Sequence, residues 1–170
     1  MKNIILTGFM ASGKTTIGAE LAKMMGFSFA DTDAMIEKAQ GRTIKEIFAS
    51  DGEEYFRCLE TQTAERTASM NGAVISTGGG MVLRTENMEH LRKNGVIFYL
   101  DTDIEVILAR LRNAAASRPL ASGVSEEDIR ARFEARRSFY ENCDFRIAVY
   151  ENDTPFMCAK KIAAIYRSTR

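Results

Sequence analysis

Short apolar runs alternate along the chain with longer segments in which apolar residues recur every three or four positions. The runs are rich in β-branched or aromatic side chains and predict four or five strands, within residues 4–6, 27–30, 73–76, 96–100 and 145–149. They lack the alternation of a half-exposed strand, so we expect both faces of each strand to be covered. The segments between them predict helices at 15–25, 53–70, 86–93, 104–112, 125–142 and 155–167, with one or two shorter helices broken near Gly41.

This alternation predicts an α/β fold with three layers, α/β/α, around a central parallel sheet of about five strands. Ligands of such sheets bind beyond the carboxyl ends of the strands, so the chemistry should lie in residues that follow strands. A length of 170 residues suits a single domain, 1–170, and is too short for two catalytic domains. The small polar stretch 113–117 is expected to be a mobile loop or a frayed helix end.

Charge and cysteine content exclude several classes of partner. The chain has 23 basic and 23 acidic residues, so no overall positive field exists to hold nucleic acid or an anionic membrane. The three cysteines are odd in number, far apart and in no CxxC pair, which disfavours a disulfide framework and a zinc site. The apolar run at the N-terminus is too short for a signal peptide, and no stretch approaches a membrane span. We expect a soluble cytoplasmic protein.

The strongest motif is Gly8-Phe9-Met10-Ala11-Ser12-Gly13-Lys14-Thr15, which fits G-x-x-x-x-G-K-[ST]. It follows a predicted strand and opens a predicted helix, which is the context that a phosphate-binding loop requires. The backbone N–H groups of such a loop surround phosphate oxygens, and the helix dipole favours their charge. Lys14 would reach the β and γ phosphates and Thr15 would ligate Mg²⁺. The motif predicts nucleoside triphosphate binding and leaves the acceptor open.

Two Asp-Thr-Asp sequences follow predicted strands. In the second, Asp103 precedes an apolar helix, and capping of that helix is the favoured interpretation. In the first, Asp31 and Asp33 follow the strand expected to neighbour the phosphate-binding loop. A phosphoryl acceptor needs a carboxylate to orient its hydroxyl and take its proton, and Mg²⁺ needs another. The alternative use of Asp33 is to cap the helix that begins at Ala34.

Further features favour a small anionic acceptor. Arg57 and Glu60 lie three residues apart on a predicted helix, where the glutamate could hold the guanidinium, although a surface pair looks the same in sequence. The triple glycine 78–80 ends the third strand and allows close approach of a ligand. Arg118 lies in the expected mobile loop, where it could stabilise a transferring phosphoryl group. Arg136 belongs to the helix that follows this loop, and alone either arginine would be a solvated surface residue.

Taken in order, these features resemble the shikimate kinase family. The family pattern comprises a phosphate-binding loop, Asp-x-Asp, Phe-Arg-x-x-Glu, a triple glycine, Arg-Pro-Leu and an arginine four residues before a tyrosine. All six occur here between Gly8 and Tyr140. The resemblance implies a P-loop kinase with a helical substrate-binding segment at approximately 32–60 and a lid at 112–124. It implies transfer of a phosphoryl group from ATP to the 3-hydroxyl of shikimate in aromatic amino acid (chorismate) biosynthesis, with Mg²⁺ as cofactor, by a monomer.

The resemblance also implies roles for individual residues. Lys14, Asp33 and Arg118 would be catalytic, with Asp33 as base or orienter, while Thr15 and Asp31 would support the metal. The residues expected to bind ATP are Gly8, Ala11, Ser12, Gly13, Lys14, Thr15, Thr16, Arg112 and Arg118. The residues expected to bind shikimate are Asp33, Arg57, Gly79, Gly80 and Arg136.

The sequence departs from the family pattern at several positions, and two alternative functions remain open. Ala11 stands where the family often has another glycine, and Arg137 follows Arg136, although helix geometry places the two about 100° apart and allows only one to face inward. Arg112 would stack on adenine, although its spacing to Arg118 is one residue longer than expected. The rivals are another small P-loop kinase, acting on gluconate or a nucleoside monophosphate, and a nucleotide-dependent switch without a small substrate.

Overall fold

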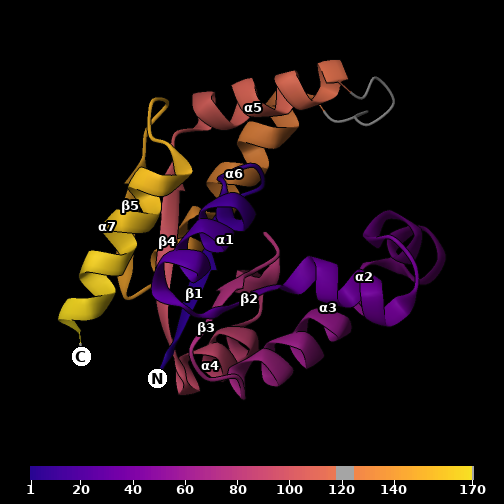
Figure 1. Ribbon diagram of the computed structural model, residues 1–170. Helices are drawn as coiled ribbons and strands as arrows, with labels where there is room; N and C mark the ends of the chain where they lie inside the picture. The colour runs from indigo at the N-terminus through magenta and orange to yellow at the C-terminus, as the bar shows by residue number, and fades with distance from the viewer. Residues whose placement is uncertain (118–124, 170) are drawn as a thin grey trace.

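The structure is a computed structural model that describes residues 1–117 and 125–169 (Figure 1). In the described residues a five-stranded parallel sheet has the order β2-β3-β1-β4-β5. The strands are β1 (Asn3–Thr7), β2 (Ser28–Asp31), β3 (Ala73–Ser76), β4 (Gly95–Thr102) and β5 (Phe145–Val149). The predicted parallel sheet is therefore confirmed.

Helices cover both faces of the sheet, as expected from its uniformly apolar strands. They are α1 (Lys14–Met25), α2 (Thr32–Gln40), α3 (Ile44–Ala68), α4 (Thr85–Lys93), α5 (Ile104–Ser117), α6 (Glu126–Glu141) and α7 (Pro155–Ser168), with a short 3₁₀ helix, η1 (Met81–Leu83). α1 and α7 pack on one face around Leu21 and Ile162, while α3, α4 and α6 pack on the other around Ile75 and Phe133. Each face encloses its own apolar core.

The structure decides between local alternatives that the sequence left open. Asp31, and not Asp33, caps α2, because its Oδ1 accepts hydrogen bonds from the backbone N–H groups of Asp33 and Ala34 at 3.1 and 3.2 Å. Residues 113–117 form the end of α5, which agrees with the second of the two expectations for this stretch and with the high helix propensity of alanine. Asp103 does cap α5, since its Oδ1 accepts from Glu105 N at 2.7 Å.

The strand register brings the sequence motifs to one edge of the sheet. Leu6 pairs with Ser76 and Phe98, and Asp31 also pairs with Ser76. The phosphate-binding loop, the first Asp-Thr-Asp and the triple glycine therefore leave the sheet side by side. Among the helices of residues 1–117 and 125–169, none combines the length and apolar character needed to cross a membrane.

Candidate active site

The phosphate-binding loop wraps around the amine of Lys14. Lys14 Nζ donates hydrogen bonds to the carbonyl oxygens of Gly8 and Phe9, each at 2.8 Å. Gly13 precedes α1 with φ 100°, and Ala11 has φ 57°, a left-handed conformation that explains why glycine suits that position. Burial lowers the pKa of Lys14 to about 8, against the opposing effect of Asp33 and Asp31. Among the described residues, no carboxylate forms an ion pair with Lys14.

Oxygen donors suited to a hard cation meet beside this loop. Thr15 Oγ1 donates a hydrogen bond to Asp31 Oδ2 at 2.8 Å, so the two residues predicted to support the metal lie in contact. Hydroxyl and carboxylate oxygens are ligands that Mg²⁺ accepts. In the described part of the chain no group of three or more Asp, Glu, His or Cys side chains converges as a ligand set. Such a site suits a cation that is held largely by nucleotide phosphates and water.

Asp33 lies in the cleft and is a weaker acid than an ordinary aspartate. Burial raises its pKa to about 6, assisted by the neighbouring charges of Asp31 and Glu60 and opposed by Lys14. Its carboxylate rests against Gly78, where an added methyl group would overlap a carboxylate oxygen. The Gly78 N–H donates to Thr32 Oγ1 at 2.8 Å, which holds the loop against the start of α2. The first glycine of the triplet thus makes room for a protein carboxylate, in addition to any room that the loop gives a ligand.

Arg57 is held between two glutamates. Its Nη1 donates to Glu60 Oε2 at 2.5 Å, while its Nε and Nη2 donate to Glu53 Oε1 at 3.3 and 2.8 Å. Arg57 is 9% exposed and Glu60 0%, so this is not the surface pair that the sequence allowed as an alternative. Burial raises the pKa of Glu60, and its second oxygen lacks a hydrogen-bond partner in the described residues. Because a buried charge is costly unless it is paired, Glu60 and Arg57 depend on each other for their position in the fold.

The last two glycines connect this arginine with α6. A methyl group on Gly80 would overlap the Arg57 guanidinium, whereas one on Gly79 would make only ordinary contacts, at 3.7 Å or more. Tyr140, from α6, donates its hydroxyl to Gly79 O at 2.6 Å. Arg136 lies one turn before Tyr140. Its positive charge lowers the pKa of both Glu60 and Tyr140, so it lies on the cleft side of α6.

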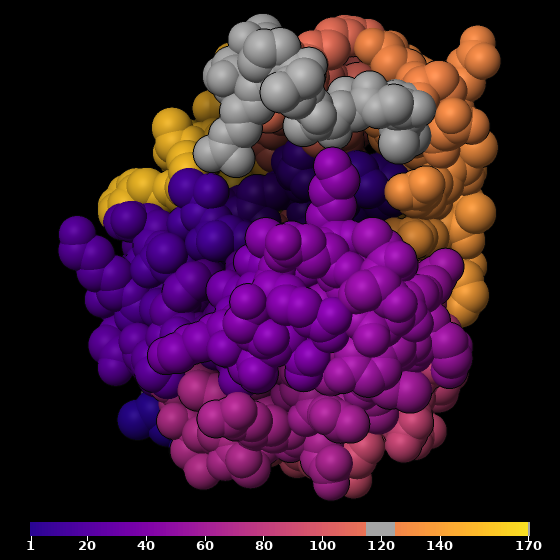
Figure 2. Space-filling view, turned by 90° about the vertical axis from the view of Figure 1, so that its right-hand side faces the viewer, coloured from indigo at the N-terminus to yellow at the C-terminus, as the bar shows by residue number. Residues whose placement is uncertain are grey.

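Arg137 lies on a different side of α6. It pairs with Glu134 at 3.1 Å and stacks 5.4 Å from the Phe133 ring centroid. The structure thus places Arg136, and not its neighbour, with Arg57. Figure 2 shows the surface hollowed between the magenta α2–α3 region and the orange α6, with the indigo N-terminal segment at its floor.

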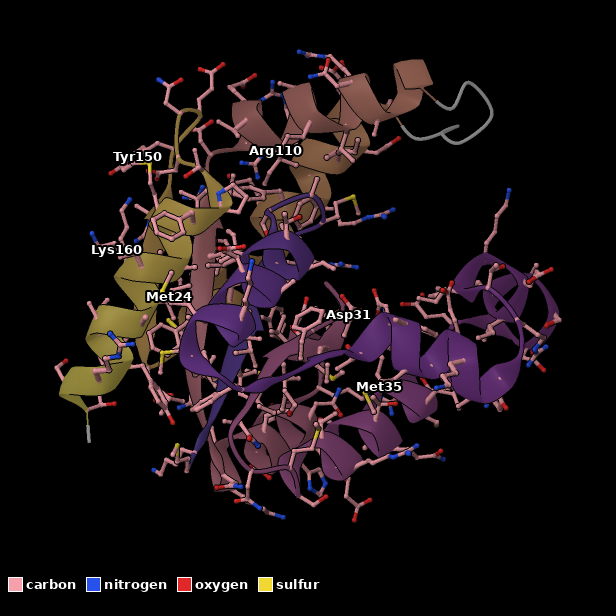
Figure 3. All side chains as sticks on the ribbon, viewed as in Figure 1. Met24, Asp31, Met35, Arg110, Tyr150 and Lys160 are labelled. Carbon is pink, nitrogen blue, oxygen red and sulfur yellow. The ribbon has the colours of Figure 1, made fainter. Side chains whose placement is uncertain are left out.

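Arg112, predicted to stack on adenine, pairs with a glutamate of α6. It is exposed, and its Nε and Nη2 donate to the two carboxylate oxygens of Glu126, at 2.5 and 2.6 Å. Arg110 instead points to the phosphate-binding loop and donates to Ala11 O at 3.0 Å (Figure 3). It lines a cavity of about 450 Å³ together with Lys14, Thr15 and Pro155.

Two further site residues, Arg110 and Glu53, were not predicted. Helix geometry gave no signal for Arg110, because at about 100° per residue position 110 lies no nearer than position 112 to the buried stripe that Ile107 and Leu108 mark on α5. No signal existed for Glu53 either. Arg118, predicted as a catalytic and ATP-binding residue, lies outside the described residues, as do residues 118–124 of the expected lid.

The parallel sheet, its phosphate-binding loop and the buried carboxylate beside the loop define a P-loop kinase for small molecules. Comparison with known proteins gives the family. The chain belongs to the shikimate kinase family, whose sequence model matches residues 10–167.

Three similar proteins illustrate the match. A shikimate kinase of Caldicellulosiruptor bescii is 45% identical over 166 residues, covering 98% of this chain and 96% of the relative. One from Persephonella marina is 41% identical over 162 residues, covering 95% and 97%. The solved structure of the shikimate kinase from Acinetobacter baumannii in complex with shikimate has a TM-score of 0.89 and 32% identity, covering all of this chain and 95% of that one. The fold and family that the motifs predicted are confirmed.

Proposed function

We propose that this chain transfers the γ-phosphoryl group of ATP to the 3-hydroxyl of shikimate, giving shikimate 3-phosphate and ADP in chorismate biosynthesis. The observation that carries the proposal is the meeting, at one edge of the sheet, of Lys14 in its loop, the buried Asp33 and the Arg57–Glu60 pair. The relatives named shikimate kinase support it.

Asp33 binds the acceptor hydroxyl and takes its proton. A base works best when its pKa lies near the working pH, and a value of about 6 meets this requirement better than an ordinary aspartate. Lys14 neutralises charge that develops on the transferring group, and Arg118 adds to this from the lid segment 112–124. Lys14 Nζ donates to two backbone carbonyls, and burial lowers its pKa, so a phosphate placed beside it would favour the charged form.

The acceptor carboxylate binds to Arg57 and Arg136, with Gly79 and Gly80 lining the site. A planar guanidinium offers paired N–H donors that match a carboxylate, so two arginines give both charge and orientation. The burial of Arg57 against Gly80 supports this role, because a fixed guanidinium holds the ring at a fixed distance from the phosphate-binding loop. The segment 32–60, which carries both Asp33 and Arg57, is the substrate-binding segment.

Thr15 and Asp31 hold the Mg²⁺ that accompanies ATP, with Asp31 acting largely through water. When bound, the ion neutralises phosphate charge and orients the γ-phosphoryl group. The contact between the Thr15 hydroxyl and Asp31 supports this assignment.

Gly8, Ala11, Ser12, Gly13 and Thr16 complete the ATP site around the phosphates. We assign Arg110 in place of Arg112 to the side of the nucleotide base, since Arg110 lines the cavity that continues from the loop.

The partners are small molecules, and we propose a cytoplasmic monomer that binds neither nucleic acid nor membrane. The balance of 23 basic and 23 acidic residues supports the exclusion of polyanions. The three separated cysteines favour a reducing compartment.

An acceptor panel tests the function. The purified chain is incubated with ATP and Mg²⁺ and with shikimate, gluconate or a nucleoside monophosphate, while ADP release is followed and the product is identified by ³¹P NMR. We expect saturable turnover with shikimate alone. Turnover on another acceptor without shikimate turnover would assign a different small-molecule kinase, and acceptor-independent ATP hydrolysis would favour a nucleotide switch.

A further inference from the structure

Glu53 occupies the donors through which Arg57 would bind a carboxylate. Its Oε1 accepts from both Nε and Nη2 of Arg57, and this pair of N–H groups forms one of the two edges on which a guanidinium binds a carboxylate. Glu60 takes Nη1 at the other end. We propose that Glu53 is an internal competitor, which the carboxylate of the acceptor replaces on Arg57, and that Glu53 thereby sets the affinity for the acceptor. The inference rests on the proposed function.

Arg57 has little freedom to avoid this exchange. The residue is only 9% exposed, and its guanidinium lies against the backbone of Gly80, where even a methyl group would overlap it. It cannot turn a different edge to the cleft without leaving Glu60. An incoming carboxylate that binds the Nε–Nη2 edge must therefore share that edge with Glu53 or replace Glu53 on it.

The two glutamates differ in how easily they can leave. Glu60 is fully buried and anchors the guanidinium from beneath. The Glu53 side chain is 66% exposed, so its carboxylate can return to water without a large desolvation change. Exchange of one carboxylate for another keeps Arg57 paired throughout, which avoids a buried unpaired charge.

The backbone gives Glu53 a second stable position. Gly52 has φ 82° and ψ 176° and interrupts α3, so Glu53 begins the second half of that helix. A carboxylate in the first turn of a helix is favoured by the free N–H groups and the helix dipole. After displacement from Arg57, Glu53 can interact with this helix end.

The surrounding charges support a position of Glu53 at the proposed site of the acceptor carboxylate, between Arg57 and Arg136. Hydrogen bonding and charge from Arg57 lower the pKa of Glu53, and Arg136 and Arg132 on α6 act in the same direction. The carboxylate of Glu53 is thus within the field of both arginines assigned to the acceptor. A second carboxylate placed there competes with it for the same positive charge.

Direct binding of shikimate tests the proposal. Titration calorimetry without nucleotide compares the wild-type chain with Glu53→Gln, Glu53→Ala and a control, Glu65→Gln, which neutralises an exposed glutamate two turns beyond Arg57 on the same helix. The two Glu53 variants should bind shikimate about two- to fivefold more tightly, the gain expected on loss of one exposed ion pair. The control should bind like the wild type, and the affinity for ATP should be the same in all four proteins.

The outcomes separate this inference from the proposed function. Unchanged or weaker binding of shikimate by both Glu53 variants, with normal binding by the wild type, would overturn the inference alone; weaker binding would make Glu53 a residue that orients Arg57. Absence of shikimate binding by the wild type would overturn the proposed function, and the inference with it. A thermal melt of each variant checks that it is folded.

Discussion

The carboxylate of Asp33 is held where its charge is costly. Its pKa in the folded chain is about 6, against an ordinary value of 3.8, because of burial and the charges of Asp31 and Glu60. The folded state therefore binds the proton more tightly than the unfolded state, and stability falls as the pH rises between these two values. Above pH 6 the ionised group destabilises the fold by about 3 kcal/mol, at about 1.4 kcal/mol per pKa unit.

Asp33→Asn should separate function from stability. Loss of the base should lower kcat by about 10²- to 10⁴-fold, while removal of the costly charge should raise the melting temperature at pH 8 by several degrees. Steady-state kinetics and calorimetry measure the two effects. Asp103→Asn is the matched control, because asparagine caps a helix as well as aspartate does. Near-normal turnover of Asp33→Asn would remove this residue from the mechanism.

Gly79 and Gly80 of the triple glycine differ in what surrounds them. At Gly80 an added methyl group meets the Arg57 guanidinium, whereas at Gly79 it meets protein atoms only at ordinary distances. We expect Gly80→Ala to displace Arg57 and raise the KM for shikimate by about 10-fold or more, the value of a charge-assisted hydrogen bond.

Gly79→Ala distinguishes the protein contact from the ligand contact. A raised KM in this variant would indicate that position 79 lies against the acceptor itself, as proposed. Equal, normal KM values for both alanine variants would contradict the role assigned to the loop. Acceptor and ATP KM values, measured side by side, show whether the nucleotide site is spared.

At the scale of elements, α6 and the triple-glycine loop are joined by one hydroxyl. Tyr140 donates to Gly79 O and stacks on Tyr99 with ring centroids 5.4 Å apart. The ring packing fixes the helix, and the hydroxyl fixes the loop relative to the helix. Arg136 is carried by the same helix, so the hydrogen bond sets the distance between the two sides of the acceptor site.

Tyr140→Phe should raise the KM for shikimate by about 2- to 10-fold and leave the KM for ATP unchanged, since one hydrogen bond is lost and the ring stays in place. Tyr166→Phe is the matched control. It removes a tyrosine hydroxyl that donates to the Lys2 carbonyl at the opposite end of the sheet. Equal effects of the two changes on the KM for shikimate would show that the Tyr140 hydroxyl matters only for stability.

The rotation of α5 turns Arg110 toward the phosphate-binding loop and Arg112 toward Glu126. We expect Arg110→Ala to raise the KM for ATP several-fold, because the side chain lines the cavity and contacts Ala11. Arg112→Ala breaks an exposed pair with Glu126, and we expect little effect on either KM. The reverse ranking would restore Arg112 to the ATP site. Both variants retain α5 without a new glycine or proline, so the comparison is direct.

Elements were easier to predict than the contacts between them. Periodicity located the helices because each must bury an apolar stripe, and it placed the strands because both of their faces are covered. It began a helix at residue 53, directly after Gly52, where the structure has the interruption of α3, but it did not predict the contact between Glu53 and Arg57. The capping role of Asp31 was also missed, since either aspartate could have started α2.

For the whole molecule, the zero net charge conceals a strongly charged cleft. Lys14, Arg57 and Arg136 come from three different helices and face Asp33 and Glu60. Charges of both signs meet within the site, so the cleft can hold anionic substrates although the chain as a whole has no net charge.

The pH dependence of kcat/KM for ATP should reflect this balance. Activity should fall below about pH 6, where Asp33 becomes protonated, and above about pH 8, where Lys14 loses its charge. The loss of activity above about pH 8 should be smaller in kcat than in kcat/KM, because bound phosphates favour the charged form of Lys14. A profile that is flat from pH 5 to pH 9 would contradict both assignments.

By itself the sequence determined the family, the parallel α/β fold and the motifs that carry the chemistry. These properties depend on local periodicity and on ordered spacing, which can be read along the chain. Only the tertiary structure decided that Arg110 contacts the phosphate-binding loop, why Gly78 and Gly80 must be small, and that Glu53 shares Arg57 with Glu60. The reason is that helix rotation and the packing of separate elements fix these contacts, and neither is encoded in any single segment.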